Sequence, residues 1–338
     1  MKIKGLNRII PGGRHIESMG DNLLLYTLDD GMYCNGALIS PTYLYPYLNY
    51  DGGHYLRSSE PPAIYRLDSE SNSIGLCVSR SRRIRLGTSD ELLLLGRYKN
   101  REHTYTLELE GKVIWTKTTS FSQVIQVGPY ALFYQGRGQL ESSCQLIELT
   151  TGAVLWELDH PDAYIKQVYP YEDKVIIVWF WEIGSKGTSR VLCVEVPSGK
   201  VLWENDAARK YKKYGEDKLV QFYVHYWEDG NDDRDLYAKL DVHTGEVYTR
   251  RYPGYNANVF VTTIYKDYLF YGAEKHNAYV GAIDLRTHEM LDEVKVDFTP
   301  GDFNHIQSIG VHDGQLYVEI QTELDHSDIH VLDLDEDE

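Results

Sequence analysis

The chain has few cysteines, no paired cysteine motif and no long apolar run. Its four cysteines, Cys34, Cys77, Cys144 and Cys193, lie far apart among 338 residues and form no CxxC pair. Buried free thiols are therefore a simpler interpretation than a disulfide framework or a zinc site. No apolar run is long enough to cross a bilayer, and the N-terminal sequence MKIKGLNRII lacks the continuous core of a signal peptide. These absences predict a cytoplasmic protein without a membrane segment.

Positive charge and phenylalanine are also scarce. Lys and Arg number 34 against 51 Asp and Glu, which gives a net charge of −17. This charge disfavours binding to nucleic acid or to an anionic membrane, and it favours a protein partner, above all a basic one. Only 8 Phe accompany 28 Tyr. Tyrosine places an apolar ring beside a polar hydroxyl, so we expect many half-buried aromatic positions.

The sequence also lacks the common catalytic motifs. It contains no GxSxG elbow, no P-loop, no Gly-rich dinucleotide fingerprint and no HExxH pair. The acidic segment from Glu228 to Asp235 does not have the ligand spacing of an EF-hand. We therefore expect no metal ion and no cofactor, and a noncatalytic role is favoured over an enzyme.

A repeated hairpin organises the chain. The stretch LIELTTGAVLW, residues 146–156, alternates apolar and acidic residues, turns at Gly152 and continues into a second strand. An acid between two apolar residues recurs at positions 108, 148, 195, 241, 284 and 333, and a weaker copy is centred on Arg66. Four copies have a turn glycine (Gly111, Gly152, Gly199 and Gly245), and His288 replaces it in a fifth. A regular spacing with this β content is typical of stacked supersecondary units.

Two further strands precede each hairpin, so one repeat has four antiparallel strands, as in a propeller blade. The seven copies predict an all-β, seven-bladed β-propeller, with residues 1–338 as a single domain. The chain ends soon after Leu334, so the last blade lacks its outermost strand. We expect the N-terminal segment MKIKGLNRII to supply this strand beside residues 332–334, which would close the ring and cover an open edge.

The turn sequences carry a resemblance to a known family. The stretches TTGAVLW (150–156), PSGKVLW (197–203) and EGKVIW (110–115) resemble the repeat of the PQQ-like, or quinoprotein alcohol dehydrogenase-like, β-propeller superfamily. The tryptophan of that repeat is present in three copies only, since Thr249 and Asp292 replace it in two later ones. The resemblance implies a propeller and a role as an assembly scaffold. Quinone-dependent catalysis is disfavoured because little sequence lies outside the seven units.

The first predicted blade departs from the pattern. Residues 29–62 separate its expected second strand, 23–28, from its expected third strand, 63–67. We predict a Tyr-rich insertion here, because long loops in compact domains are often functional. Its aromatic residues resemble a protein-binding surface, and the candidate binding residues are Tyr43, Tyr45, Tyr47, Tyr50, His54 and Tyr55. The alternative is that these tyrosines only pack the insertion against the ring.

Two hypotheses of function remain. The first is a noncatalytic protein–protein interaction module with an acidic, Tyr-rich face, of which an immunity or inhibitor protein for a basic toxin is a narrower form. The second is a hydrolase or lyase acting on a glycan or small molecule at the channel mouth, which would require paired carboxylates or a partnered His. A weaker candidate anion site is formed by basic residues between blades, Arg83, Arg85, Lys210 and Lys212. Solvated connector charges are the alternative interpretation of these residues.

Overall fold

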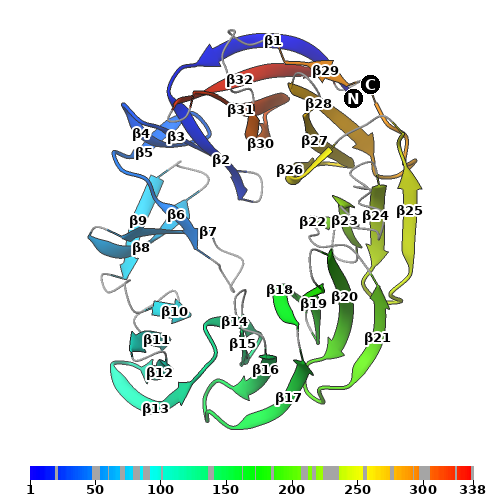
Figure 1. The fold of residues 1–338 in the computed structure, drawn as a ribbon. Coiled ribbons are helices and arrows are strands. Elements are labelled where there is room, and N and C mark those ends of the chain that lie inside the picture. The colour runs from blue at the N-terminus through cyan, green and yellow to red at the C-terminus, as the bar shows by residue number, and fades with distance from the viewer. Residues whose placement is uncertain are drawn as a thin grey trace.

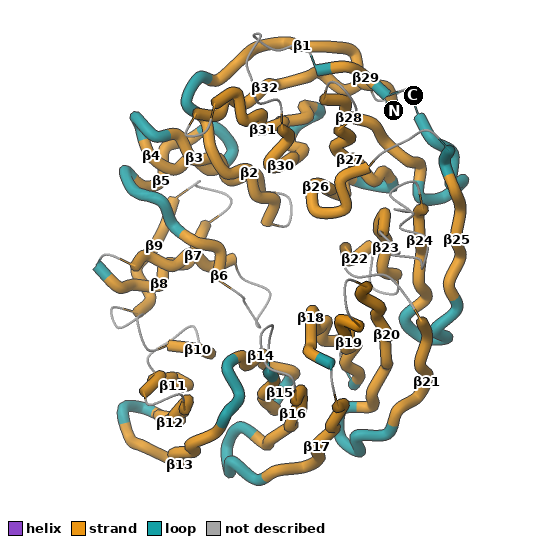
Figure 2. The backbone as a smooth tube through the Cα atoms, in the orientation of Figure 1, coloured by secondary structure: helices purple, strands orange, loops and turns teal. Residues whose placement is uncertain are grey.

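The computed structural model shows a ring of four-stranded antiparallel sheets around a central axis (Figure 1). It describes residues 1–19, 22–47, 54–59, 61–68, 73–78, 84–86, 92–99, 102–135, 141–161, 163–171, 173–183, 186–206, 212–214, 218–223, 236–253, 257–274, 278–291, 293–296, 305–323 and 326–335. Figure 2 shows that the described segments are strands joined by loops and turns. Within these ranges no helix offers the length and apolar character that a membrane span requires.

The blades follow one another in chain order, and each runs from an inner strand to an outer strand. Blades 1 to 4 consist of β2 (Gly13–Met19), β3 (Asn22–Thr27), β4 (Gly31–Cys34) and β5 (Ala37–Ser40); β6 (Tyr45–Tyr47), β7 (His54–Ser59), β8 (Pro62–Asp68) and β9 (Ser73–Val78); β10 (Ile84–Leu86), β11 (Leu92–Lys99), β12 (Glu102–Leu109) and β13 (Lys112–Thr119); and β14 (Gln123–Val127), β15 (Tyr130–Tyr134), β16 (Glu141–Glu148) and β17 (Val154–Pro161).

The second half of the ring repeats this arrangement and ends on the N-terminal strand. Blades 5 to 8 consist of β18 (Tyr164–Tyr171), β19 (Lys174–Ile183), β20 (Lys186–Glu195) and β21 (Val201–Asp206); β22 (Lys212–Tyr214), β23 (Lys218–Tyr223), β24 (Leu236–Asp241) and β25 (Val247–Arg251); β26 (Ala257–Tyr265), β27 (Tyr268–Glu274), β28 (Ala278–Asp284) and β29 (Val294–Lys295); and β30 (His305–His312), β31 (Gln315–Glu323), β32 (His326–Asp335) and β1 (Lys2–Ile10).

The prediction of seven blades is wrong, because the described residues form eight four-stranded sheets. The additional blade comes from residues 29–62, which contain β4, β5, β6 and β7. The strand expected to be third in the first blade, at 63–67, lies in β8 and is third in blade 2. The sequence signal for the uncounted hairpin is the dipeptide Asn35-Gly36, where both residues have positive φ, 50° and 84°. An Asn-Gly pair of this kind is the preferred two-residue hairpin turn.

The predicted closure of the ring is confirmed. Strand β1 pairs antiparallel with β32, with Leu6 opposite Leu332 and Ile3 opposite Leu334. The two ends of the chain therefore share blade 8, and the two termini lie close together in Figure 1. Because β1 pairs with the outer edge of β32, the backbone N–H and C=O groups along that edge are not left open.

The core lies between the blades. Eight apolar clusters each join two successive blades, as expected for sheets packed face to face around an axis. Strand β19 shows how one strand serves two clusters: Val175, Ile177 and Trp179 pack in the cluster with blade 4, whereas Ile176 and Val178 pack in the cluster with blade 6. Alternate residues point to opposite faces of a strand, so this strand is continuously apolar from Val175 to Trp181.

Successive blades of the regular part are also joined by tryptophan. Trp156 on β17 donates its indole N–H to the carbonyl of Val196 in the next blade, 2.6 Å away. Its ring covers Gly199, where an added Cβ would lie 2.5 Å from Trp156 Cγ. Trp115 and Trp203 repeat this arrangement over Gly152 and Gly245. These turn glycines all have positive φ, so they supply both the backbone conformation and the space for the ring.

The repeated acid holds the turn in place. Asp241 accepts hydrogen bonds from the backbone N–H groups of His243 and Thr244, and Asp284 accepts them from Arg286 and Thr287. The longer Glu148 and Glu195 instead accept the hydroxyl groups of Thr151 and Ser198. The acidic series is therefore structural in these copies, since its carboxylates are occupied by their own turns.

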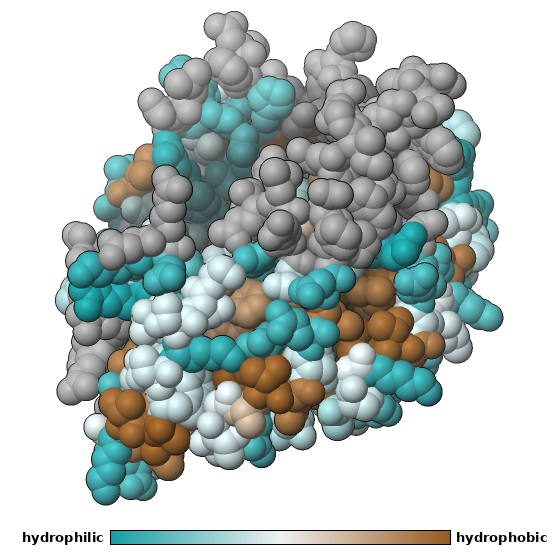
Figure 3. All heavy atoms as spheres, turned by 60° about the horizontal axis from the view of Figure 1, so that its bottom comes forward, coloured by the Kyte–Doolittle hydropathy of each residue, from teal (hydrophilic) through white to brown (hydrophobic). Residues whose placement is uncertain are grey.

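The outer surface is mixed in character. Figure 3 shows apolar patches that are separated by hydrophilic residues over the part of the ring at the bottom of Figure 1. The strands β13, β17 and β21 each have two consecutive exposed apolar residues at or next to their first position, such as Val154 and Leu155. The repeat thus places similar apolar pairs on successive outer strands.

Candidate functional site

Four aromatic side chains gather where blade 1 passes into blade 2. Tyr43 lies in the connector between β5 and β6, and its ring centroid is 5.1 Å from that of Tyr26, 4.6 Å from that of Tyr45 and 5.1 Å from that of His15. We call His15, Tyr26, Tyr43 and Tyr45 the aromatic face. His15 and Tyr45 are exposed, while Tyr26 and Tyr43 are half-buried. Edge-to-face packing fixes the rings in place and leaves part of their surface open to solvent.

Local backbone geometry brings these rings together. His15 has a φ of 53° and lies at an irregularity in the pairing of β2 with β3, which changes the direction of its side chain. Tyr26 lies near the end of β3, and Tyr45 begins β6. The start of an inner strand, the end of a second strand and the connector between blades meet at the same face of a propeller. Three segments that are separate in sequence therefore contribute to one surface.

The aromatic face has an acidic surrounding. Burial, together with the charges of Glu17 and Glu319 and the neighbouring Tyr45, raises the pKa of Tyr43 to about 12. Tyr43 therefore remains a neutral phenol at physiological pH and can donate a hydrogen bond. Glu17 is exposed on β2, whereas Glu319 is 4% exposed and accepts the hydroxyl of Ser308 at 2.5 Å. The negative potential here suits a positively charged group.

A small pocket opens beside this surface on the inner strands. We call it the axial pocket; it has a volume of about 180 Å³ and is lined by Ile16, Glu17 and Ser18 from β2, Val261, Thr262 and Thr263 from β26, and Gln307, Ser308 and Ile309 from β30. Ser308 also accepts the backbone N–H of Ile16, which fixes the positions of β30 and β2 relative to one another. Glu17 is the acidic residue on the described lining. The pocket therefore offers hydroxyl and amide groups around a single exposed carboxylate.

The predicted binding residues have different surroundings. Tyr43 and Tyr45 belong to the aromatic face. Tyr55 is 3% exposed and packs in the apolar cluster between blades 2 and 3 with Ile64. Tyr47 and His54 lie in strands β6 and β7, but their side chains lie outside the described part, and Tyr50 lies outside the described residues. His15 and Tyr26 complete the site, and sequence analysis missed them because they precede the Tyr-rich segment.

The predicted anion site lies mostly outside the described part. Arg85 and Lys212 lie in strands β10 and β22, where only the backbone is described, and Arg83 and Lys210 lie outside the described residues, as does the whole acidic segment 228–235. Within the described ranges, no group of three or more His, Cys, Asp or Glu side chains is arranged to hold a metal ion.

Comparisons with known proteins show the fold. No family model matches the chain, and no curated protein matches it in sequence. A solved structure described as the Dos1 propeller is similar, with a TM-score of 0.51 and 11% identity over 98% of this chain and 94% of that chain. The dihydro-heme d1 dehydrogenase NirN in complex with DHE gives a TM-score of 0.47 and 13% identity over 83% of this chain and 66% of that chain. The similarity supports a β-propeller and assigns no PQQ-like family.

Proposed function

We propose that this chain is a noncatalytic protein-binding module whose aromatic face binds a basic segment of a partner protein. The observation that carries the proposal is the cluster of His15, Tyr26, Tyr43 and Tyr45 next to the exposed carboxylate of Glu17. Partly exposed tyrosines supply rigid contact area, and aromatic faces attract Lys and Arg side chains. A chain with a net charge of −17 also attracts a basic partner over a distance.

The axial pocket supports the same proposal. It has room for a small polar group, and Glu17 belongs both to its lining and to the surroundings of Tyr43. We infer that a Lys or Arg side chain of the partner enters this pocket and pairs with Glu17. A glycan hydrolase would need a second reacting carboxylate or a partnered His, whereas the neighbouring Glu319 is buried and bound to Ser308. This arrangement favours binding over catalysis.

The experiment is a selection from a displayed library of random twelve-residue peptides. We expect the purified ring to enrich peptides with Lys or Arg, and the affinity of a selected peptide to fall by about tenfold or more for Tyr45→Ala, as at an interface hot spot. Glu17→Gln should reduce binding less, and its effect should shrink at high salt. Tyr98→Ala is the matched control, because Tyr98 is also exposed (61%, against 52% for Tyr45) but lies on β11 in blade 3.

Two results would contradict this function. One is enrichment of peptides without positive charge. The other is an equal loss of affinity for Tyr45→Ala and Tyr98→Ala, because binding would then not depend on the aromatic face. Cleavage of a glycan library by the wild type, abolished in Glu17→Gln, would instead support the enzymatic alternative.

We also propose that the protein works in a reducing, cytoplasmic setting and belongs among the PQQ-like repeat scaffolds. All four cysteines are free, and Cys34, Cys144 and Cys193 are buried. Burial raises the pKa of Cys34 to about 11, so this thiol is unreactive. The tryptophan that covers a turn glycine in three blades matches the residues on which the family resemblance rests. A disulfide found in protein purified from its own cells would contradict the first proposal.

A further inference from the structure

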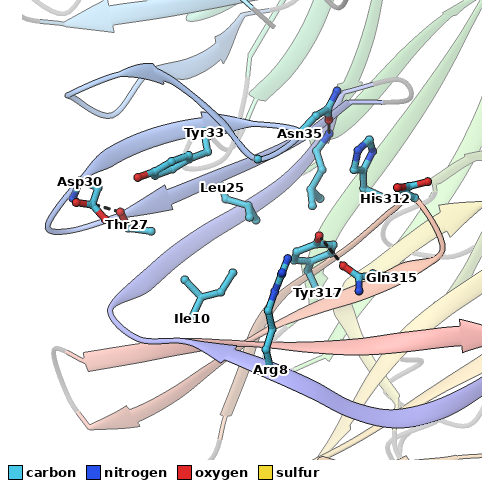
Figure 4. Close-up of a pocket in the computed structure, with 13 residues that line it drawn as sticks. Arg8, Ile10, Leu25, Thr27, Asp30, Tyr33, Asn35, His312, Gln315 and Tyr317 are labelled. Carbon is cyan, nitrogen blue, oxygen red and sulfur yellow. Dashed lines mark hydrogen bonds between the residues drawn. The ribbon is translucent and has the colours of Figure 1, made fainter.

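A second cavity lies at the seam of the ring, on the other side of blade 1 from the aromatic face. We call it the seam pocket; it has a volume of about 420 Å³ and lies between blade 8 and blade 1 (Figure 4). Its lining comes from the closing strand β1, from β3 and β4 with their turns, and from the β30–β31 hairpin. A cavity of this size is within the range of sites for small molecules.

Short strands explain why the seam is hollow. Strands β4 and β5 have 4 residues each, whereas their counterparts β16 and β17 in blade 4 have 8 each. A short outer half covers less of the neighbouring blade, so the side chains of β31 and β1 that face blade 1 have fewer side chains packed against them. The cavity therefore results from a specific departure of blade 1 from the repeat.

The floor of the pocket is apolar. Leu23, Leu25 and Tyr317 are 1%, 7% and 7% exposed, and Ile10 is half-buried beside them. The Tyr317 hydroxyl donates to Gln315, whose amide donates in turn to Asp333, so the ring of Tyr317 is held in one orientation. A rigid apolar floor of this kind suits an aliphatic or aromatic body.

The rim carries opposite charges at separate places. Arg8 extends from β1 into the pocket, and its guanidinium forms no ion pair or hydrogen bond within the described residues, while its neighbours Lys4 and Asn7 bind Asp335 and Asp333. Asp30 lies apart from Arg8 across the pocket, next to Tyr33 (Figure 4). Burial, then the charge and hydrogen bonding of Asp30, raises the pKa of Tyr33, so its hydroxyl stays protonated beside the Asp30 carboxylate. Asp313 adds a second carboxylate to the lining.

From this arrangement we propose that the seam pocket binds a small zwitterion with an apolar body, namely a short apolar peptide or an amino acid. Its carboxylate pairs with the Arg8 guanidinium, its ammonium group pairs with Asp30, and its side chains pack on Leu23, Leu25 and Tyr317. A simple anion would be repelled by Asp30 and Asp313, and a simple cation would leave Arg8 unpaired. This site is independent of the aromatic face and of its proposed partner.

The test uses calorimetry with defined probes on the full chain. The dipeptide Leu-Phe and phenylalanine should bind, whereas N-acetyl-phenylalanine, which lacks the ammonium, and phenylalanine amide, which lacks the carboxylate, should bind about tenfold more weakly or worse. Arg8→Gln should weaken the binding of Leu-Phe by a similar factor. This variant should also no longer bind phenylalanine more tightly than phenylalanine amide. Arg97→Gln, at an exposed arginine on β11, is the matched control and should change nothing.

Stability measurements separate binding from folding. Arg8 is exposed and pairs with Val331 through its backbone, so Arg8→Gln should keep the wild-type Tm. If Arg8→Gln unfolds, Asp30→Asn replaces it, and this variant should bind Leu-Phe more weakly but N-acetyl-phenylalanine at least as tightly as the wild type does, because the repulsion of its carboxylate by Asp30 is removed. The proposal is overturned if neither free probe binds at millimolar concentration, if the blocked probes bind as well as the free ones, or if Arg8→Gln and Arg97→Gln behave alike.

Discussion

The arc from blade 3 to blade 6 and the region of blades 8, 1 and 2 use the same four-stranded unit but are joined differently. In the arc, Trp115, Trp156 and Trp203 each bind a carbonyl and cover a turn glycine of the next blade. In blades 1 and 2 the described residues show no such tryptophan. The joint between blades 8 and 1 holds the seam pocket instead, and the joint between blades 1 and 2 holds the aromatic face. The regular joints are closely packed, whereas cavities and exposed rings occur where the repeat is shortened.

The joint from blade 6 to blade 7 is intermediate between these two. Here His288 stands at the turn position with a φ of 58°, and Tyr252 and Arg250 donate hydrogen bonds to its carbonyl at 2.6 and 2.7 Å. The His288 ring stacks on Tyr248 with centroids 4.2 Å apart. A bulkier turn residue has therefore been accommodated by replacing the indole with smaller rings.

The largest effect should come from removing an indole of the arc. Trp156→Ala deletes a ring that is 9% exposed and leaves the Val196 carbonyl unpaired, so we expect a loss of about 3–5 kcal/mol in the free energy of unfolding. Leu155→Ala, at a neighbouring side chain that is 42% exposed, should cost less than about 1 kcal/mol. Urea unfolding checks both, and equal losses would show that the tryptophan does not join the blades.

A smaller effect should follow from filling the space under the same ring. Gly199→Ala places a Cβ against Trp156 and puts a side chain at positive φ, so we expect a loss of about 2–4 kcal/mol. Gly128→Ala has the same backbone problem, with a φ of 57°, but its Cβ meets open space and should cost only about 1–2 kcal/mol. Thermal unfolding of both variants isolates the cost of the contact with the tryptophan. A Tm for Gly199→Ala equal to that of Gly128→Ala would contradict it.

The turn aspartate Asp241 should contribute less to the free energy of unfolding than the contacts between tryptophan and glycine. Burial alone would raise the pKa of Asp241, but the Lys218 ammonium and the N–H groups of Thr244 and His243 lower it to about 2. A depressed carboxyl pKa stabilises the fold above the unfolded value near 4, and this contribution is lost as the pH falls toward 2. Asp241→Asn should therefore cost about 1 kcal/mol at pH 7 and less at pH 3, measured by urea unfolding. A pH-independent cost would contradict this account.

The smallest effect concerns the intermediate joint. Burial, then the charges of Lys239 and Arg250, lowers the pKa of His288, so the unfolded chain binds a proton more readily than the folded one. Stability from His288 is therefore complete above the unfolded value near 6.5 and is lost as the pH falls through the folded pKa. His288→Asn keeps a residue that tolerates positive φ and removes the proton. We expect its Tm to fall less than that of the wild type between pH 8 and pH 5; an identical fall would exclude His288 as the source.

The sequence pattern predicts the regular blades correctly, whereas its prediction for the region of blades 1 and 2 is wrong. The acid series is a local signal that identifies the third strands of blades 3 to 8, and the turn glycines mark the start of the fourth strands in blades 3 to 6. Blade 1 lacks the acid, so the sequence places its strands β4 and β5 in an insertion, although Asn35-Gly36 marks their hairpin. Tyr43 and Tyr45 were predicted as binding residues from the expected length of that insertion and its Tyr-rich composition. His15 and Tyr26 were not, because their place beside Tyr43 depends on how β2 and β3 pack.

By itself, the sequence determined the four-stranded unit, its turns and the closure of the ring by the N-terminal strand, since each of these depends on residues close together in the chain or on an edge that needs a partner. Only the tertiary structure decided that the ring has eight blades, that Trp156 covers Gly199, and that Arg8 faces Tyr317. These arrangements join residues that are tens to hundreds of positions apart. They depend on how closely neighbouring sheets pack, and a local sequence pattern contains no information about the distance between two sheets.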